Sequence, residues 1–279
     1  MPSVTLTKHH GLGNDFLVLI GANGAAPAEG SWASFAARVC HRRHGIGADG
    51  LLLATVADDD ERAGTGADLV MRLYNSDGTT AEMSGNGVRC LVQGWARALG
   101  VEQGAVVVAT GAGPRRVEFS PGSESATMMA TVDMGPVAPI DAPAGWLDVA
   151  AHEHRPVAHL SVGNPHTVVA VEDVAAVDLR TVGQRVPDVN LEVVEPGPEP
   201  SAITMRVHER GAGITEACGT GACAAAWAAA TWGLVEPASG EITVHMDGGD
   251  AMVRLDDPAP GRVTLIGPAT FVGTVEVEL

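Results

Sequence analysis

The chain has 279 residues, of which 46% are hydrophobic and 18% are charged, and its formal net charge is −17. This length and composition suit a globular protein of two ordinary domains with a sizeable core, and they exclude an intrinsically disordered chain. The acidic balance argues against nucleic acid or an anionic membrane as a partner, since both bind basic surfaces.

No apolar run is long enough to cross a bilayer and no early segment has a secretory pattern, so we expect a cytoplasmic protein. The cysteines form no CxxC pair, which argues against a disulfide framework or structural zinc; they are Cys40, Cys90, Cys218 and Cys223. Lys8 is the only lysine in the sequence. Because a pyridoxal-phosphate enzyme needs a Schiff-base lysine, this count argues against that cofactor, and we expect none.

The first half of the chain is predicted to alternate short strands with two helices. Strands are expected at residues 4–6, 16–20, 51–56, 67–74, 105–110 and 115–119, and helices at 31–40 and 85–99. Gly100 should end the second helix. Turns are expected at 10–15 and 75–78, and residues 58–61 are expected to form a solvated acidic loop.

A similar order of elements recurs after residue 126. Strands are expected at 131–134, 157–162, 167–171, 203–207, 244–246, 251–255 and 263–266, a helix at 219–232, turns at 163–166 and 247–250, and a loop at 195–200. The Gly-Asn turns at Asn14 and Asn164 lie about half a chain length apart. We therefore expect an internal duplication, with a first domain at 1–126 to which strand 267–279 returns, and a second domain at 127–266.

Two stretches are expected to place a Gly-rich turn at a helix N-terminus. Residues 84–87 read Ser-Gly-Asn-Gly, and residues 218–221 read Cys-Gly-Thr-Gly. Such a turn offers backbone N–H groups and the positive end of a helix dipole, so it can bind a carboxylate and lower the pKa of a thiol. Two facing thiols could act on opposite faces of one carbon, but here the first copy carries Ser84.

Polar residues near the second helix start suggest an amino-acid site. Glu209 could hold an ammonium group and Arg210 a carboxylate, while His166 could polarise a thiol or hold its proton. Each also has an ordinary explanation, as a surface ion pair or a hydrogen-bonded loop histidine. The asparagines of the predicted turns could simply be turn residues, namely Asn14, Asn75 and Asn164. The combination of features, rather than any one, favours a site.

Six motifs occur in order along the chain, at residues 10–16, 75–78, 84–89, 163–166 with Asn190, 209–211 and 217–221. With them the chain resembles the pyridoxal-phosphate-independent diaminopimelate epimerases over nearly its whole length. Each motif alone is a weak signal, whereas six in order are specific.

The resemblance implies an α+β fold of two similar, pseudo-symmetric domains. Each would be a curved, mostly antiparallel sheet around a central helix, with the active site in the cleft between the domains. The implied reaction converts LL-diaminopimelate to the meso form, a step in lysine and peptidoglycan precursor biosynthesis. One group removes the α-proton and a second returns a proton on the other face. The partner is then a small-molecule amino acid, and a homodimer is compatible with the resemblance.

The same resemblance assigns roles to individual residues. The catalytic positions are Cys218 and Ser84, where the family has cysteine, with His166 and Glu209 tuning the thiols. The substrate-binding positions are Asn14, Asn75, Gly85, Asn86, Asn164, Asn190, Glu209, Arg210, Gly219 and Thr220.

Ser84 departs from the family pattern. A hydroxyl is a far weaker acid than a thiol, and a helix dipole worth about 1 kcal/mol cannot make it a useful base near neutral pH. Cys90 is no easy replacement, because it lies more than a helical turn further on and faces away from the helix start. We therefore expect a chain that binds diaminopimelate but epimerises it poorly. An introduced Cys→Ser change is favoured over a natural variant, because the other motif positions fit.

Two other functions stay open: a related amino-acid isomerase or dehydratase that uses a Ser–Cys pair, or a catalytically silent binding protein of the same fold. Asn190, Glu209 and Arg210 favour the epimerase, because they match the family's contacts to the distal end of the substrate. We expect no metal, since no further ligands complete a site around the histidines His152, His154 and His159, and residues 58–61 lack calcium-ligand spacing.

Overall fold

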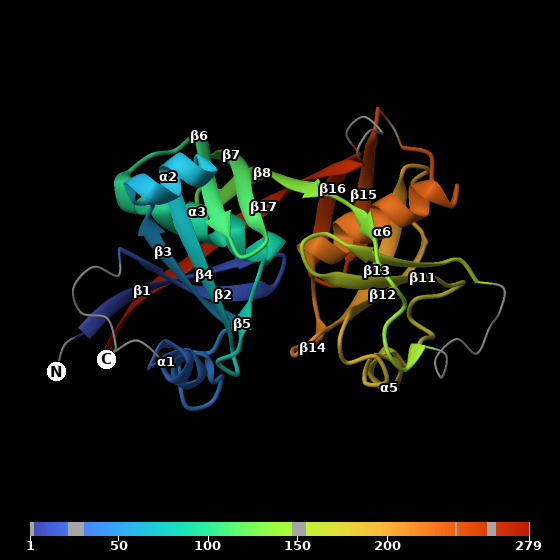
Figure 1. The fold of residues 1–279 in the computed structure, drawn as a ribbon, viewed down its shortest axis with the longest axis horizontal. Coiled ribbons are helices and arrows are strands. Elements are labelled where there is room, and N and C mark those ends of the chain that lie inside the picture. Colours follow the sequence, from blue (N-terminus) through green and yellow to red (C-terminus); the bar gives the residue numbers. More distant parts are fainter. Residues whose placement is uncertain (1–2, 22–30, 147–154, 238, 256–260, 279) are drawn as a thin grey trace. The chain divides into compact units, whose positions relative to one another are not determined.

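The structure, a computed structural model, describes residues 3–21, 31–146, 155–237, 239–255 and 261–278. The chain forms two compact units (Figure 1). Unit 1 comprises Met1–Val132 with Pro268–Leu279, and unit 2 comprises Asp133–Gly267. Both junctions fall inside strands, namely β8 (Thr127–Pro136) and β17 (Arg262–Glu278). The limits expected from the sequence were residues 126 and 266.

Unit 1 contains a ring of paired strands. Its elements are β1 (Ser3–Gly11), β2 (Asn14–Ile20), α1 (Ser31–Cys40), β3 (Gly50–Val56), α2 (Asp59–Thr65), β4 (Leu69–Asn75), β5 (Thr80–Ala81), α3 (Gly85–Leu99), β6 (Gly104–Thr110), β7 (Gly113–Pro121), and parts of β8 and β17. Antiparallel pairs β1–β2, β3–β4, β6–β7 and β7–β8 are joined by the parallel pairs β2–β3 and β4–β6. The ring closes because β17 pairs with both β1 and β8.

Unit 2 repeats this pairing order. Its elements are β9 (Ala138–Pro139), β10 (Val157–Ser161), β11 (Pro165–Ala170), α5 (Leu179–Gly183), β12 (Asn190–Pro196), β13 (Ala202–Glu209), β14 (Gly213–Thr215), α6 (Gly219–Thr231), β15 (Glu241–Met246), β16 (Gly249–Leu255), and parts of β8 and β17. Antiparallel pairs β10–β11, β12–β13 and β15–β16 alternate with parallel pairs β11–β12 and β13–β15. The expected α+β class with two similar units is confirmed.

One long helix is buried within each unit (Figure 1). In α3, residues 85–94 are all buried, and the helix contacts strands β1 to β4. In α6, residues 219–226 are all buried, and the helix contacts β10 to β13, β15 and β16. A helix buried on every side suits the Ala-rich sequence of α6, because small side chains let strands pack closely around it. None of the helices in the described ranges is long and apolar enough to span a membrane.

The local predictions hold best for the helices. Those predicted at 31–40 and 85–99 have these limits in α1 and α3, and α6 ends at Thr231, one residue before the predicted limit. The acidic loop predicted at 58–61 is wrong, because Asp58 caps a helix, α2. The Asp58 carboxylate accepts from the Glu61 N–H, and the Glu61 carboxylate accepts from the Asp58 N–H. This reciprocal capping box satisfies two helix-end donors.

Three predictions about strands and turns also need correction. The turn at 10–15 is only Leu12-Gly13, because Gly11 pairs with Asn14 and both turn residues have positive φ, at 56° and 83°. Strand β12 was not expected, and it extends to Pro196 into the predicted loop. Strands 263–266 and 267–279 form one continuous strand, β17, within the described residues.

Candidate active site

The first half-site is the start of α3 in unit 1. Ser84 is the N-cap, with extended backbone angles of φ −141° and ψ 123°, and its Oγ accepts a hydrogen bond from Gly87 N at 3.0 Å. The Ser84 side chain is half-buried. A Cβ atom added to Gly87 would lie 3.0 Å from Ser84 Cβ and 3.2 Å from Ser84 Oγ, so glycine at this position leaves room for the close cap.

Two of the predicted substrate-binding residues of unit 1 are in direct contact. Asn86 Nδ2 donates to Asn14 Oδ1 at 3.2 Å, and Asn14 Nδ2 donates to Asp49 Oδ2 at 2.8 Å. Arg89 donates to Asn86 Oδ1 at 2.8 Å. Both asparagines are buried, so their amide orientations are fixed by these partners.

A charged cluster supports the β1–β2 turn. Arg42 donates to Asp15 and to Asp49, each at 2.7 Å, and Lys8 pairs with Asp15 at 2.8 Å. Burial disfavours the charged Asp15 carboxyl, but the hydrogen bonds from Arg42 and Lys8 outweigh it and lower its pKa. The single lysine of the chain is therefore held in an ion pair.

Asn75 ends strand β4. Its Nδ2 donates to Thr79 Oγ1 at 3.0 Å within its own turn. The neighbouring residue, Ser76, donates its N–H to Asp49 O at 2.9 Å. Asp49 therefore connects the Asn75 turn to Asn14.

The second half-site is the start of α6 in unit 2. Cys218 is the N-cap, with φ −127° and ψ 114°, and its Sγ accepts from Gly221 N at 3.4 Å. The sulfur also lies 3.5 Å from Thr220 Oγ1. Cys218 is only 4% exposed. Ser84 and Cys218 therefore occupy the same capping position in their respective units.

The pKa of Cys218 differs from the expectation that a helix start lowers the pKa of its thiol. Hydrogen bonds from Thr220 and Gly221 favour the thiolate, as the helix start predicts, but burial and the nearby carboxylates of Glu209 and Glu192 outweigh them. The pKa of Cys218 is consequently raised well above its ordinary value, so Cys218 is a thiol near neutral pH.

Glu209 lies beside this thiol at the end of β13. Burial raises the pKa of the Glu209 carboxyl, while hydrogen bonds from Thr215 and Cys218 oppose that shift. The Thr215 hydroxyl donates to Glu209 Oε1. A buried carboxyl with a raised pKa in contact with a thiol can accept and return a proton, which suits acid–base chemistry.

A chain of hydrogen bonds connects the other predicted residues of unit 2 to Cys218. His166 Nε2 contacts Asn164 Oδ1 at 2.9 Å, and Asn164 Nδ2 donates to Thr220 Oγ1 at 3.2 Å. His166 Nδ1 contacts Glu192 Oε1 at 2.7 Å. His166 is therefore linked to the thiol through Asn164 and Thr220 rather than by direct contact.

Asn190 holds the two loops on either side of it. Its Nδ2 donates to Pro165 O at 3.1 Å, and its Oδ1 accepts from Arg210 N at 2.9 Å. Asn190 thus fixes the backbone beside His166 and beside Arg210. The structure brings these predicted residues together around the start of α6.

Glu192 is a further residue of this half-site that was not predicted from the sequence. This residue is completely buried on β12 and contacts His166. The signal was a single acidic residue in the otherwise apolar run 191–194, because a carboxylate is rarely buried without a partner.

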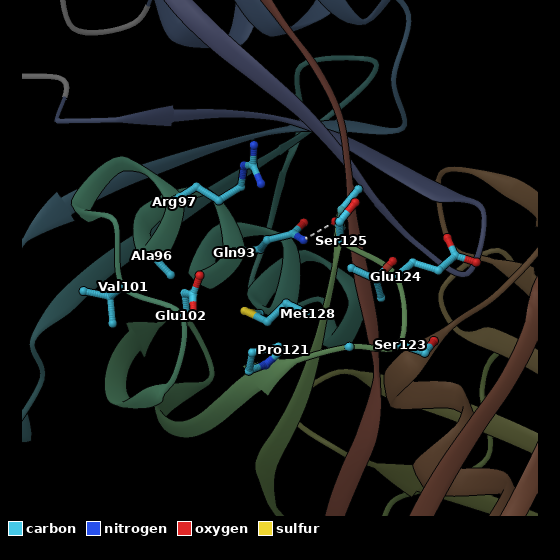
Figure 2. Close-up of a pocket in the computed structure, with 13 residues that line it drawn as sticks. Gln93, Ala96, Arg97, Val101, Glu102, Pro121, Ser123, Glu124, Ser125 and Met128 are labelled. Carbon is cyan, nitrogen blue, oxygen red and sulfur yellow. Dashed lines mark hydrogen bonds between the residues drawn. The ribbon is translucent and has the colours of Figure 1, made fainter.

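A separate cavity of about 470 Å³ lies at the other end of α3 (Figure 2). Gln93, Arg97 and residues 121–128 line it, and none of the predicted site residues does. Gln93 Nε2 donates to Ala126 O and to Ala269 O, each at 2.8 Å, so its amide joins α3 to β17 and to the residue just before β8.

The histidines considered as metal ligands give no site among the residues that the structure describes. His159 Nδ1 contacts Thr167 Oγ1 at 3.0 Å, whereas His152 and His154 lie outside the described residues. Across the described ranges no group of three or more His, Cys, Asp or Glu side chains is arranged to hold a metal ion.

Solved structures share this two-unit fold. A phenazine biosynthesis protein of the PhzF family from Bacillus anthracis has a TM-score of 0.74, with 15% identity over the full length of both chains. A hydroxyproline epimerase from Agrobacterium vitis has a TM-score of 0.67, with 16% identity over 99% of this chain and 91% of that one. The chain therefore shares its fold with these two proteins.

The family model described as diaminopimelate epimerase matches residues 6–139 and 159–272. A diaminopimelate epimerase from Synechococcus elongatus is 37% identical over 303 residues, which cover 99% of both chains. One from Sphingopyxis alaskensis is 38% identical over 287 residues, covering 98% of this chain and 96% of the relative. The chain belongs to the diaminopimelate epimerase family, and its enzyme class is that of an isomerase.

Proposed function

We propose that this protein converts LL-diaminopimelate to meso-diaminopimelate without a cofactor, and that Ser84 slows this reaction. The observation that carries the proposal is the equivalent capping geometry of Ser84 and Cys218 at two buried helix starts. Each helix start can bind a carboxylate, and each cap places a proton-transfer group beside it. The reaction requires both half-sites to act on one α-carbon.

In this proposal Cys218 supplies one proton-transfer group, and its proton exchanges with Glu209, to which it hydrogen-bonds. In one direction the Cys218 thiol protonates the carbanion, and Ser84 must remove the α-proton. In the other direction Cys218 gives its proton to Glu209 and acts as the thiolate base, and Ser84 must protonate the carbanion. A hydroxyl is too weak an acid to protonate the carbanion efficiently, and it is too rarely ionised near neutral pH to remove the α-proton. Both directions are therefore slow.

The remaining predicted residues are proposed to hold the substrate. The backbone and side chains at the two helix starts would bind the reacting carboxylate, and the buried amides and Arg210 would bind the rest of the molecule. The members of this set are Asn14, Asn75, Gly85, Asn86, Asn164, Asn190, Glu209, Arg210, Gly219 and Thr220. The hydrogen bonds Asn86–Asn14 and Arg210–Asn190 support the proposal, because they hold polar groups in place before substrate binds.

The compartment and the oligomeric state belong to this proposal as well. The four cysteines are free thiols, which suits a reducing compartment, so we place the activity in the cytoplasm. A homodimer stays a prediction, to be checked by light scattering.

The test combines binding and turnover. Calorimetry should detect LL- and meso-diaminopimelate binding to the unchanged chain and to Ser84→Cys, but not lysine, which lacks the distal carboxylate. Ser84→Cys should epimerise LL-diaminopimelate, and Ser84→Cys with Cys218→Ser should not. Binding without turnover in Ser84→Cys would favour a silent binding protein. Turnover of another amino acid by the unchanged chain would favour an isomerase or dehydratase that uses the Ser–Cys pair.

A further inference from the structure

The two half-sites differ at one buried strand position. In unit 1, Leu52 pairs with Val18 in the parallel β2–β3 ladder, and in unit 2, Glu192 pairs with Val168 in the parallel β11–β12 ladder. A Cβ atom added to Gly87 would lie 3.4 Å from Leu52 Cδ2, and one added to Gly221 would lie 2.6 Å from Glu192 Oε1. Leu52 and Glu192 therefore occupy the same place below the first turn of their helices.

This equivalence shows that the fold does not need a carboxylate there. Leucine fills the position in unit 1 with the same ladder and the same helix start. Burying a carboxylate disfavours folding unless the group is well paired. Glu192 is completely buried, and its Oε2 has no hydrogen-bond partner among the described residues. Stability alone does not favour Glu192 at this position, whereas a role in the Cys218 half-site would explain it.

We propose that Glu192 is a positioning residue, which fixes His166 so that the Thr220 hydroxyl directs its proton at the Cys218 sulfur. This inference rests on the proposed function, since the epimerase reaction is what uses the sulfur.

The direction of each hydrogen bond supports this role. An amide oxygen can only accept, so His166 Nε2 must carry a proton to donate to Asn164 Oδ1. Asn164 Nδ2 in turn donates to Thr220 Oγ1, which leaves the Thr220 proton for the sulfur 3.5 Å away. His166 Nδ1 and Glu192 Oε1 lie 2.7 Å apart, so a second proton must lie between them, because a bare imidazole nitrogen and a bare carboxylate oxygen can only accept. This hydrogen bond holds the ring in this orientation. Without it the ring can turn, Nε2 no longer faces Asn164 Oδ1, and the order of donors is lost.

Four titratable groups face one another here, namely Cys218 on α6, Glu209 on β13, Glu192 on β12 and His166 on β11. The carboxylates favour the protonated thiol, whereas the Thr220 hydroxyl stabilises the thiolate when the proton leaves. We therefore expect Glu192 to affect the rate of proton transfer more than the affinity for substrate.

The experiment uses the full chain carrying Ser84→Cys, in which turnover can be measured. Glu192→Leu copies the residue of unit 1 and removes the contact with His166. Glu192→Gln keeps the shape, and its amide can donate to Nδ1 while Nε2 stays protonated. Glu195→Gln is the matched control, because Glu195 is a carboxylate on the same strand that bonds only to Val174 N within the described residues.

We expect Glu192→Leu to lower kcat by about tenfold to a hundredfold, the usual effect of losing one hydrogen bond to a charged group, with KM nearly unchanged. Glu192→Gln should restore most of kcat, and Glu195→Gln should leave it unchanged. The idea is refuted if Glu192→Leu folds and keeps the parent kcat, or if Glu192→Gln loses as much as Glu192→Leu.

A second readout does not depend on catalysis. Imidazole nitrogen NMR shifts, assigned with His166→Gln, should show Nε2 of His166 protonated in the parent and in Glu192→Gln. They should show a lower population of that form in Glu192→Leu. Unchanged His166 signals in Glu192→Leu would contradict the positioning role. If Ser84→Cys fails to turn over diaminopimelate, the proposed function fails, yet the His166 signals still test the arrangement.

Discussion

Replacing Ser84 with cysteine should convert a slow enzyme into a fast one. The backbone angles of Ser84 and Cys218 differ by less than about 15°, and each side chain accepts from the N–H three residues on, at 3.0 Å and 3.4 Å. A thiol at residue 84 can therefore occupy the same cap as the thiol at residue 218. The substitution changes the acidity of the group and leaves its geometry nearly intact.

The size of the effect follows from acid strength. The ordinary pKa of a thiol lies about seven units below that of a hydroxyl. With a Brønsted coefficient of about 0.5, this difference corresponds to roughly three orders of magnitude in rate, or about 4 kcal/mol in activation free energy. That figure lies within the range of about 10² to 10⁴ that a positioned acid or base contributes.

The assay is α-proton exchange and epimerisation followed by proton NMR in heavy water, starting from LL- and from meso-diaminopimelate. Ser84→Cys should be about a thousandfold faster than the unchanged chain, and Ser84→Ala should be about as slow as the unchanged chain. If the unchanged chain already matches Ser84→Cys, or exceeds Ser84→Ala by orders of magnitude, serine is a competent group and the two-thiol reasoning is wrong.

The new thiol should also be the more acidic of the pair. Residue 84 is half-buried, whereas Cys218 is 4% exposed and lies near the carboxylates of Glu209 and Glu192. Alkylation by iodoacetamide, followed by peptide mass spectrometry across pH, should show half-reaction at a lower pH for residue 84 than for Cys218. The opposite order would mean that the cap of α3 is more strongly shielded than its burial indicates.

Three further predictions concern stability and the other cysteine. Burial lowers the pKa of His9 to about 4 despite its hydrogen bond with Gln93. As the pH falls, His9 of the unfolded chain is therefore protonated near pH 6.5, whereas His9 of the folded chain stays neutral until about pH 4. Stability should fall by about 3 kcal/mol between pH 6.5 and pH 4, and urea titrations of His9→Gln should lack that slope. Gly221→Ala should cost about 1–3 kcal/mol and reduce turnover in the Ser84→Cys background, because its Cβ would lie 2.6 Å from Glu192 Oε1. Cys90→Ala should leave proton exchange unchanged, since Cys90 is completely buried and burial raises its pKa to about 12.

Each of these has a simple control. Gly64→Ala in α2 meets nothing within 4 Å, so it should stabilise the protein slightly where Gly221→Ala destabilises it. A flat stability profile from pH 6.5 to pH 4 in the unchanged chain would show that His9 is protonated in the fold. Loss of exchange in Cys90→Ala with intact folding would mean that Cys90 serves in place of Ser84.

The sequence predicted the parts of the site that depend on local backbone chemistry. A capping side chain, two glycines and an apolar run specify a helix start without any tertiary information, so the caps at Ser84 and Cys218 were found with their correct limits. The Asp58 capping box has the same kind of signal, and it was overlooked because its acidic residues were interpreted as a loop.

The parts that were missed depend on contacts between distant segments. Strand β12 is recognisable only by its pairing with β11 and β13, because its sequence shows no alternation. Glu192 can be recognised as a site residue only from its contact with His166 on the neighbouring strand. The raised pKa of Cys218 likewise comes from its burial and from carboxylates on β13 and β12, whereas the sequence revealed only the helix start that lowers it.

Strand β17 has a consequence for how the protein is made. Its later residues pair with β1, from Ser3↔Glu278 to His10↔Thr270, although the whole of unit 2 separates the two strands in the chain. A ribosome therefore completes unit 2 before the last strand of unit 1 has emerged. Until then β1 lacks its partner on one side, and the N-terminal ring stays open as an exposed strand edge, the kind of surface that invites aggregation during synthesis.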